Sequence, residues 1–533
     1  MRIPAIFVYP FLVWFSLCAG LFALEFTSFL NPQTCPKDGS AELIDAVIDG
    51  DEGRVVVLLE RGVSPMLALA ALYSNMPIAQ LFLEHGASVD GVCPSGYGGS
   101  PLFFALEGFS PELDECSPIK KLEMVRFLLE SGADIHFTNE WGETPLVWYL
   151  MKRAGREAEG LALEIVDLLL AYGVNVNAES SRDFSALHYS VDRRCYSVSG
   201  LLLEHGADVN AENLKGSTAL HISDYRISQL LLEYGADVHV LNQDGETPLF
   251  NAAYEGVDQL LLLVENGASL DVVNASGMTP LMKIVRGINI PSKRSLGEEE
   301  AWLFPRVEAL LKLGADVNFS EETTGETVLF KVVGSEYSYY SMDARIKAAM
   351  LFFEYGADAN AVSHSGRTPL FEVFKYEEVY NEGFEFVELL LDHGAKADVV
   401  DLRGETLLFQ VARTHWCGCE GYWDSWSCRG KADERRWCAY QVVGFFLELG
   451  ADVNAVSENG DTAFSIAVGS GNYQTASLLL SHAPWSDLIQ SYDKIALIQL
   501  WFYTRPFWGS SNFSIATNNV CGVIGLLCLL LEV

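Results

Sequence analysis

The sequence predicts an all-α fold in which helix-turn-helix units, joined by β-turn fingers, stack into a solenoid. At 533 residues the chain is too long for one ordinary core, so several domains or a repeat architecture are expected. The phrase LLxxGAxxx recurs along it, and GxTPL follows ten residues after most copies. The glycine of the first phrase stands at 62, 86, 132, 173, 206, 235, 267, 314, 356, 394 and 450, with a degraded copy at 478–484.

The second phrase predicts the first helix of each unit. It reads GETPL at 142 and 245, GMTPL at 277, GRTPL at 366, GETLL at 404 and GSTAL at 216. Its Thr suits a helix N-cap, and its Pro suits the first helical position, where a missing N–H costs nothing. The second helix is predicted from stretches such as EIVDLLLAYG (164–173), whose apolar stripe has helical spacing and ends at a Gly. Each pair is amphipathic, so neighbouring pairs must stack to bury their faces.

This unit resembles the ankyrin repeat, whose signature T-P-L-H-x-A recurs about every 33 residues. The resemblance covers residues 37–484 in roughly twelve copies and implies an ankyrin-repeat solenoid. The family's His is kept at His188 and His221, but Phe replaces it at 103, 250, 330, 371 and 409. Because a phenyl ring cannot make the polar contacts of imidazole, we expect a more apolar core than in a consensus array.

The insertions are predicted to lie on one edge of the solenoid. The finger, from a helix-ending Gly to the Gly that opens the next unit, spans ten residues in most copies. The segment from the Pro position of TPL to the next helix-ending Gly grows from 20 residues (186→206) to 43 (407→450). Loops tolerate insertions at little energetic cost, but these insertions are rich in aromatic residues, which are typical of interaction sites. Trp423 and Trp426 are therefore candidate partner-binding residues.

A second candidate surface follows the fingers, where the variable residue of GxTP is usually acidic. The resemblance implies that this position lines the concave groove, so the carboxylates would form a binding row for a basic partner. The alternative is structural, because an acidic residue near the start of a helix complements the helix dipole. The candidate partner-binding carboxylates are Glu143, Glu246, Glu326, Glu405 and Asp461.

The longest insertion holds four cysteines, Cys417, Cys419, Cys428 and Cys438. Zinc sites usually combine two close Cys pairs, and this cluster has at most one, with His415 as a further ligand. An oxidising compartment favours disulfides, and cross-links stabilise a long loop. We therefore expect two disulfides, with zinc as the alternative. A Cys-x-Cys bridge is strained, so Cys417 and Cys419 should each pair with Cys428 or Cys438, in one of two connectivities.

Residues 1–24 are predicted to be an export signal peptide or a membrane anchor. One basic residue precedes an apolar stretch that ends at Leu24, after which the sequence turns polar. The stretch approaches the length that spans a bilayer, so cleavage and retention both stay open, as does lipid attachment at Cys18. We expect an exported protein that is periplasmic or secreted, or anchored by this segment. Residues 485–533 are predicted to form a capping helix and an apolar tail.

Composition and motifs narrow the function. The net charge of −36 argues against nucleic-acid binding, because no basic stripe is present to contact phosphates. All histidines except His415 lie at positions that the repeat pattern covers, and no HExxH, GxSxG or P-loop motif is found. We therefore expect no catalytic residue, metal or cofactor. The main hypothesis is a non-enzymatic protein–protein interaction scaffold with a basic protein partner, and the alternative is a structural scaffold attached to a membrane through its N-terminus.

Overall fold

The computed structural model describes residues 40–92, 99–107, 117–152, 159–178, 180, 184–286, 296–334, 342–374, 383–413 and 439–482. The described residues form twenty-four helices, together with isolated β-bridges such as Val400–Thr406 and Val456–Thr462. The chain divides into two compact units, unit 1 (Met1–Gln243) and unit 2 (Asp244–Val533). The segments 1–24 and 485–533 lie outside the described residues.

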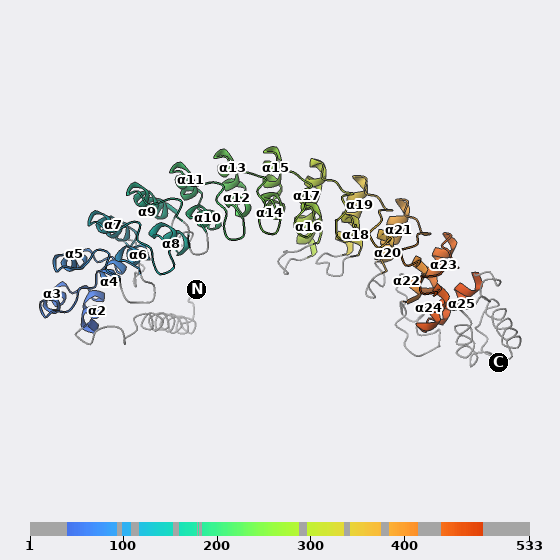
Figure 1. Ribbon diagram of the computed structural model, residues 1–533, viewed down its shortest axis with the longest axis horizontal. Coiled ribbons are helices and arrows are strands. Elements are labelled where there is room, and N and C mark those ends of the chain that lie inside the picture. Colours follow the sequence, from blue (N-terminus) through green and yellow to red (C-terminus); the bar gives the residue numbers. More distant parts are fainter. Residues whose placement is uncertain are drawn as a thin grey trace, which may run out of the picture. The chain divides into compact units, whose positions relative to one another are not determined.

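Unit 1 contains six helix pairs, each made of an even-numbered first helix and an odd-numbered second helix. Even-numbered helices pack against each other and odd-numbered helices do the same, so the unit has two layers (Figure 1). The helices are α2 (Ser40–Ile48), α3 (Glu52–Glu60), α4 (Leu67–Leu72), α5 (Met76–Glu84), α6 (Pro101–Glu107), α7 (Ser117–Glu130), α8 (Pro145–Lys152), α9 (Glu159–Ala171), α10 (Ala186–Asp192), α11 (Tyr196–Glu204), α12 (Ala219–Ile222) and α13 (Tyr225–Glu233).

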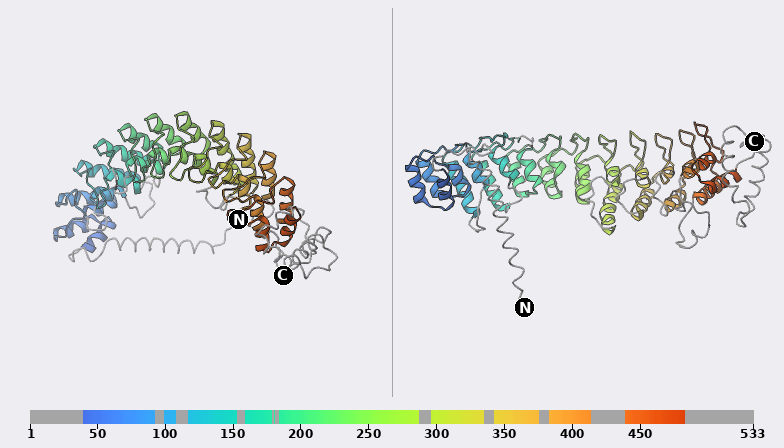
Figure 2. Two further views of the ribbon diagram at one scale, coloured as in Figure 1. Left: turned by 45° about the vertical axis from the view of Figure 1, so that its right-hand side comes forward. Right: turned by 90° about the horizontal axis from the view of Figure 1, so that it is seen from below.

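Unit 2 repeats the arrangement with six further pairs, and both layers can be followed in Figure 2. Its helices are α14 (Pro248–Glu255), α15 (Val257–Glu265), α16 (Pro280–Arg286), α17 (Leu296–Leu313), α18 (Val328–Val333), α19 (Met342–Glu354), α20 (Pro369–Glu372), α21 (Gly383–Asp392), α22 (Leu407–Arg413), α23 (Ala439–Glu448), α24 (Ala463–Gly469) and α25 (Tyr473–His482). None of the helices in the described ranges is both long and apolar enough to cross a bilayer. The predicted all-α solenoid of paired helices is confirmed.

Local chemistry sets the helix ends, as the pair α10 and α11 illustrates. The hydroxyl of Ser185 accepts a hydrogen bond from a backbone N–H in the first turn of α10. After α11, Gly206 takes a left-handed conformation with φ of 82°. The N–H groups of Gly206 and Ala207 donate to the carbonyls of Leu203 and Leu202, both at 3.0 Å. Glycine adopts this conformation without steric strain, so it closes the helix and turns the chain toward the next finger.

Two histidines in unit 1 form hydrogen bonds with the residue that caps their own helix, and His188 also bonds to the next finger. The Nδ1 atom of His188 lies 2.8 Å from the hydroxyl of Ser185, and its Nε2 atom lies 3.0 Å from the carbonyl oxygen of Ser217 in the next finger. The Nδ1 atom of His221 lies 3.0 Å from the hydroxyl of Thr218. Burial lowers the pKa of His188 below its usual 6.5, although the bond to the Ser217 carbonyl acts in the opposite direction. The fold therefore favours a neutral imidazole at His188.

Phenylalanine takes the place of this histidine elsewhere and leaves polar atoms unsatisfied. The rings are almost fully buried at Phe250, Phe330, Phe371 and Phe409. Within the described ranges, four hydroxyls at the start of first helices have no hydrogen-bond partner: Ser100, Thr247, Thr368 and Thr406. Each of the four is followed three residues later by Phe. The core is more apolar at these positions, as predicted. The four hydroxyls that lose the histidine partner stay buried without a hydrogen bond, which lowers stability.

Candidate functional site

The fingers are rigid turns that end at glycines with a left-handed conformation, and these include Gly142, Gly216, Gly245, Gly277, Gly366, Gly404 and Gly460. A polar side chain three residues before the glycine fixes most of them. Asn139 Oδ1 accepts the N–H groups of Trp141 at 3.0 Å and Glu143 at 2.9 Å. Asp401 Oδ1 accepts the N–H group of Glu405 at 3.0 Å in the same way. Such side-chain turns hold the backbone in one conformation, and the recurring Asn, Asp or Ser was the sequence signal for them that our interpretation missed.

Neighbouring fingers are joined to each other by backbone hydrogen bonds. The N–H of Ala275 donates to the carbonyl of Asp244 at 2.7 Å, and the N–H of Leu402 donates to the carbonyl of Ser365 at 3.1 Å. A Cβ atom on Gly245, whose φ is 71°, would lie 2.8 Å from the nitrogen of Ala275. Glycine is needed there for both its conformation and the close approach of the next finger. The last four fingers of unit 2 are therefore joined into a continuous edge, since the N–H of His364 donates to the carbonyl of Thr324 at 2.8 Å and that of Glu458 to the carbonyl of Arg403 at 2.8 Å.

The predicted binding residue Glu246 is buried in an internal ion pair. Lys283 Nζ, from the next helix pair, lies 2.6 Å from both carboxylate oxygens, and the two side chains are 9% and 10% exposed. Asn274 donates to the same carboxylate at 3.1 Å. The Lys283 ammonium also lies 5.6 Å from the ring centre of Phe250 and 5.7 Å from that of Tyr254. Burial, with the charge of Glu246 adding to it, raises the pKa of Tyr254.

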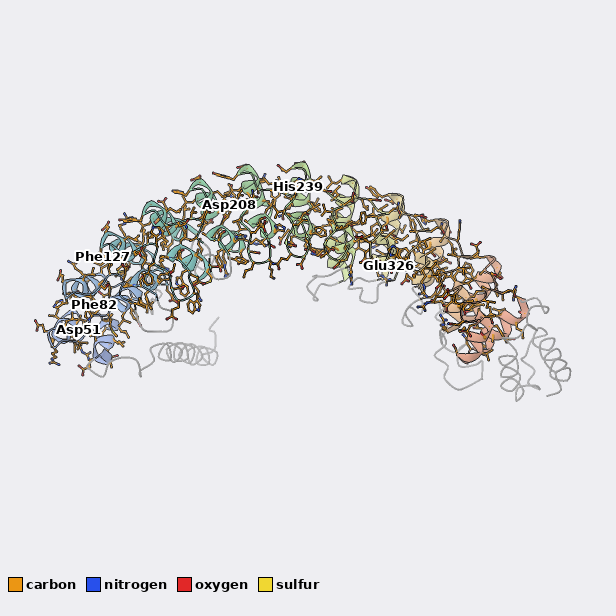
Figure 3. All side chains as sticks on the ribbon, in the orientation of Figure 1. Asp51, Phe82, Phe127, Asp208, His239 and Glu326 are labelled. Carbon is orange, nitrogen blue, oxygen red and sulfur yellow. The ribbon has the colours of Figure 1, made fainter. Side chains whose placement is uncertain are left out.

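Glu326 and Glu405 are also paired with cations of unit 2. Lys331 Nζ, on α18, lies 2.7 Å from Glu326 and 2.5 Å from Glu321; Figure 3 labels Glu326 beside this helix. Burial tends to raise the pKa of Glu321, but the hydrogen bond and charge of Lys331 outweigh it and hold that pKa below the usual 4.5. Arg413 donates to the two oxygens of Glu405 at 2.7 Å and 2.5 Å, a bidentate pair that raises the pKa of Arg413.

The remaining two carboxylates differ in their surroundings. Glu143 is buried and accepts a hydrogen bond from the side-chain amide of Asn139 at 2.9 Å. Asp461 is half-buried, and its backbone N–H donates to the hydroxyl of Ser457 at 3.1 Å. Each of the five carboxylates stands on a finger of its own unit, and three of them, all in unit 2, already have a cation within the chain. Neither a free acidic row nor a helix-dipole role alone describes this arrangement.

An aromatic cluster that the sequence interpretation missed stands on one finger of unit 1. Trp141 is 41% exposed, and its ring stacks on that of Trp148 with a centroid distance of 6.0 Å and an interplanar angle of 7°. Trp148 also makes a T-shaped contact with Phe103, with 6.0 Å between the ring centroids. The ammonium of Lys152 lies 4.8 Å from the ring centre of Trp148. Phe103 also packs on Phe137. The sequence signal that could have revealed this cluster is Trp141, a large aromatic residue directly before a finger glycine.

The insertion 414–438 lies outside the described residues. The predicted binding residues Trp423 and Trp426, the cysteines Cys417, Cys419, Cys428 and Cys438, and His415 all belong to it. Among the described residues, no group of three or more His, Cys, Asp or Glu side chains is arranged to hold a metal ion.

Comparison with protein families adds an independent finding. A family model described as ankyrin repeats (3 copies) matches residues 113–213 and 217–290. A second model, described as ankyrin repeats (many copies), matches residues 435–480. No curated protein matches the sequence. The matched ranges fall in both units and coincide with the helix pairs described above.

Proposed function

We propose, from the premise that this chain is an ankyrin-repeat protein, that it is a non-enzymatic scaffold exported from the cytoplasm to bind a protein partner. Ankyrin repeats are generally protein–protein interaction modules. The observation that carries the proposal for this chain is the exposed, stacked indole of Trp141. Tryptophan is the residue type most enriched among the side chains that dominate binding energy at protein interfaces.

The fold itself does not require an indole at this position. The residue directly before the glycine in other fingers is polar, and the set is Lys215, Asp244, Ser276, Ser365, Arg403 and Asn459. Trp141 is held by the turn at Asn139 and by its stack on Trp148. A side chain that is already ordered loses little conformational entropy on binding. Trp141 therefore has the properties of a pre-organised anchor.

The partner in this proposal is a basic protein. The net charge of −36 would steer such a partner toward the chain, and an indole face attracts Lys and Arg side chains. Glu140, next to Trp141, is exposed. The internal pairs of Glu246, Glu326 and Glu405 would have to exchange before those carboxylates could contact a partner. We therefore assign the direct contact to Trp141 and leave Trp423 and Trp426 as a second proposed contact.

A photo-crosslinking experiment tests the proposed site. Benzoylphenylalanine replaces Trp141 in the full chain, which is expressed in its own cells and irradiated. The control carries the same residue at Tyr172, which is 43% exposed but follows the second helix α9. We expect one dominant protein adduct from position 141 and none of the same mass from position 172. Adducts that are the same from both positions, or absent from both, would contradict the proposal.

Export is proposed from residues 1–24, and the same segment separates the two hypotheses about attachment. Cell fractionation with intact-mass measurement tests it. A soluble periplasmic or secreted protein that lacks residues 1–24 supports the exported binding scaffold. Recovery of the full-length chain only with membranes supports the membrane-tethered structural scaffold instead. Recovery of the full-length chain in the cytosol would contradict both.

A further inference from the structure

We infer that the last three fingers of unit 2 bind an amphipathic α-helix of a basic partner, one that carries apolar residues at every seventh position. The inference rests on the proposed protein-binding function and names the form of the partner. It starts from a row of exposed valines. Four residues before the finger glycine stand Val362, Val400 and Val456, which are 60%, 47% and 53% exposed.

The three valines lie on adjacent fingers that hold a fixed geometry. Leu402 N–H donates to the Ser365 carbonyl at 3.1 Å, and Glu458 N–H donates to the Arg403 carbonyl at 2.8 Å, so the fingers are joined in sequence. In each finger, the residue after the valine is buried, which directs the valine outward because successive side chains of extended backbone alternate. Leu402, at the tip of the middle finger, is 68% exposed and enlarges the apolar surface.

Packing within the repeat does not explain the valines. At the same finger position, unit 1 has Leu241, which is 53% exposed, but also Thr138 and Glu212, and both of these polar residues are exposed. The finger forms equally well with these polar residues, so the fold does not demand an apolar side chain there. Val273, 38% exposed, shows that the preference extends to an earlier finger of unit 2. Scattered exposed apolar residues are normal, but an aligned row of them marks an interaction surface.

The spacing of the row excludes an extended strand as the occupant and is compatible with a helix. Packed helices lie about 8–10 Å apart, so residues at the same position of adjacent repeats have about this separation. Along an α-helix, seven residues span about 10.5 Å and return to nearly the same face. In an extended strand, three residues span about 10 Å but point to opposite faces, whereas two or four residues span about 7 or 13 Å. A polyproline II segment, at about 9 Å per three-residue turn, would also return to one face. We commit to the helix because Leu and Lys, which an apolar and basic segment requires, are strong helix formers. Tighter binding of a proline-rich peptide with leucines three residues apart would overturn this choice.

Charge complementarity makes that helix basic. Four cations of the first helices and fingers of unit 2 are paired with internal carboxylates: Lys283, Lys331, Arg367 and Arg413. The exposed residues around the valines include the acidic Asp398, Asp452 and Glu458. The middle finger also carries the exposed basic residues Lys396 and Arg403. The exposed acidic residues outnumber them, so a helix with lysines beside its apolar stripe is favoured over an acidic one.

The probe that tests this inference is a labelled Ala/Lys helical peptide of about 22 residues with leucines seven residues apart. A matched peptide of the same composition carries its leucines about five residues apart, which spreads them over three faces. Binding to the full chain is measured by fluorescence anisotropy. We expect the first peptide to bind at least about tenfold more tightly than the second, a difference of about 1.4 kcal/mol.

A triple variant, Val362→Thr, Val400→Thr and Val456→Thr, should weaken that binding at least about tenfold. Threonine keeps the β-branched shape and already stands at Thr138, so the fold should be retained, as a thermal melt would verify. The control replaces two exposed apolar residues away from the fingers, Met350→Thr on α19 and Leu449→Thr directly after α23, which are 50% and 46% exposed, and should leave binding unchanged. Equal binding of the two peptides, no binding of either, or equal loss in both variants would overturn the helical partner. The crosslinks from Trp141 are measured in unit 1 and can succeed when this test fails.

Discussion

Unit 1 and unit 2 build the same helix pairs but satisfy their polar groups with different chemistry. In unit 1 the contacts between repeats use neutral groups, such as His188 with the Ser217 carbonyl. In unit 2 the corresponding position is Phe in four repeats, and contacts between repeats use charges, as in the pair of Lys283 and Glu246. The array can therefore satisfy most of its buried polar groups with either neutral or ionic partners. The two units should then respond differently to mutation, packing defects and pH.

The largest difference is expected from breaking the buried ion pair of unit 2. Lys283→Met leaves the carboxylate of Glu246 buried without its cation, which should lower the free energy of unfolding of unit 2 by roughly 3–5 kcal/mol. Urea unfolding followed by circular dichroism measures this. The double variant Lys283→Met with Glu246→Gln removes the charge and keeps an acceptor for Asn274. It should recover most of the loss. An equal loss in both variants would show that packing, not charge, governs the site.

A packing defect should uncouple the two units. Leu249 is fully buried in α14 of unit 2, and Leu249→Ala should cost roughly 2–5 kcal/mol through the lost contacts and the cavity. Because contacts in a repeat array are between neighbours, the lesion should weaken unit 2 more than unit 1. Calorimetry should then show two transitions in place of one. A single sharp transition shifted as a whole would contradict this and would indicate that the units unfold together.

Much of this architecture could be predicted from sequence because it depends on local signals. The cap Thr, the Pro and the helix-ending Gly act within a few residues, so the helix pairs and fingers were predictable. The partner of Glu246 could not be found in this way, since Lys283 stands 37 residues further on, in the next pair. The unbonded hydroxyls followed from the Phe substitutions, whereas Trp141 was hidden by its place in an otherwise polar turn.

A matched pair of isosteric variants isolates the polar network of the first helices. Thr218 in unit 1 bonds His221, so Thr218→Val should cost roughly 1–3 kcal/mol because a buried imidazole nitrogen loses its partner. Thr368 in unit 2 has an unbonded hydroxyl, so Thr368→Val should be neutral or slightly stabilising. Chemical denaturation of both variants measures the difference. Similar losses in both would mean that the methyl and hydroxyl groups act through packing alone.

The smallest expected effect is that of pH. The two units should lose stability in different pH ranges. The folded pKa of His188 lies below its usual 6.5, so the unfolded chain takes up a proton at that site before the folded chain does. Stability of unit 1 is therefore complete above about pH 6.5 and falls as pH drops toward the folded pKa. The folded pKa of Glu321 in unit 2 lies below its usual 4.5. The stability that this residue adds is present above about pH 4.5 and is lost only as pH falls through the folded pKa.

His188→Phe tests this assignment, because Phe250 shows that the repeat accepts Phe at the equivalent position. The variant also loses the hydrogen bond to the Ser217 carbonyl, so its absolute stability is not the informative quantity. The change in unfolding free energy between about pH 7.5 and about pH 5.5 is informative, since only a group that titrates in this range contributes to it. We expect a smaller change in the variant than in the natural chain. An equal change would mean that His188 has the same pKa folded and unfolded, and that other histidines cause the acid sensitivity of unit 1.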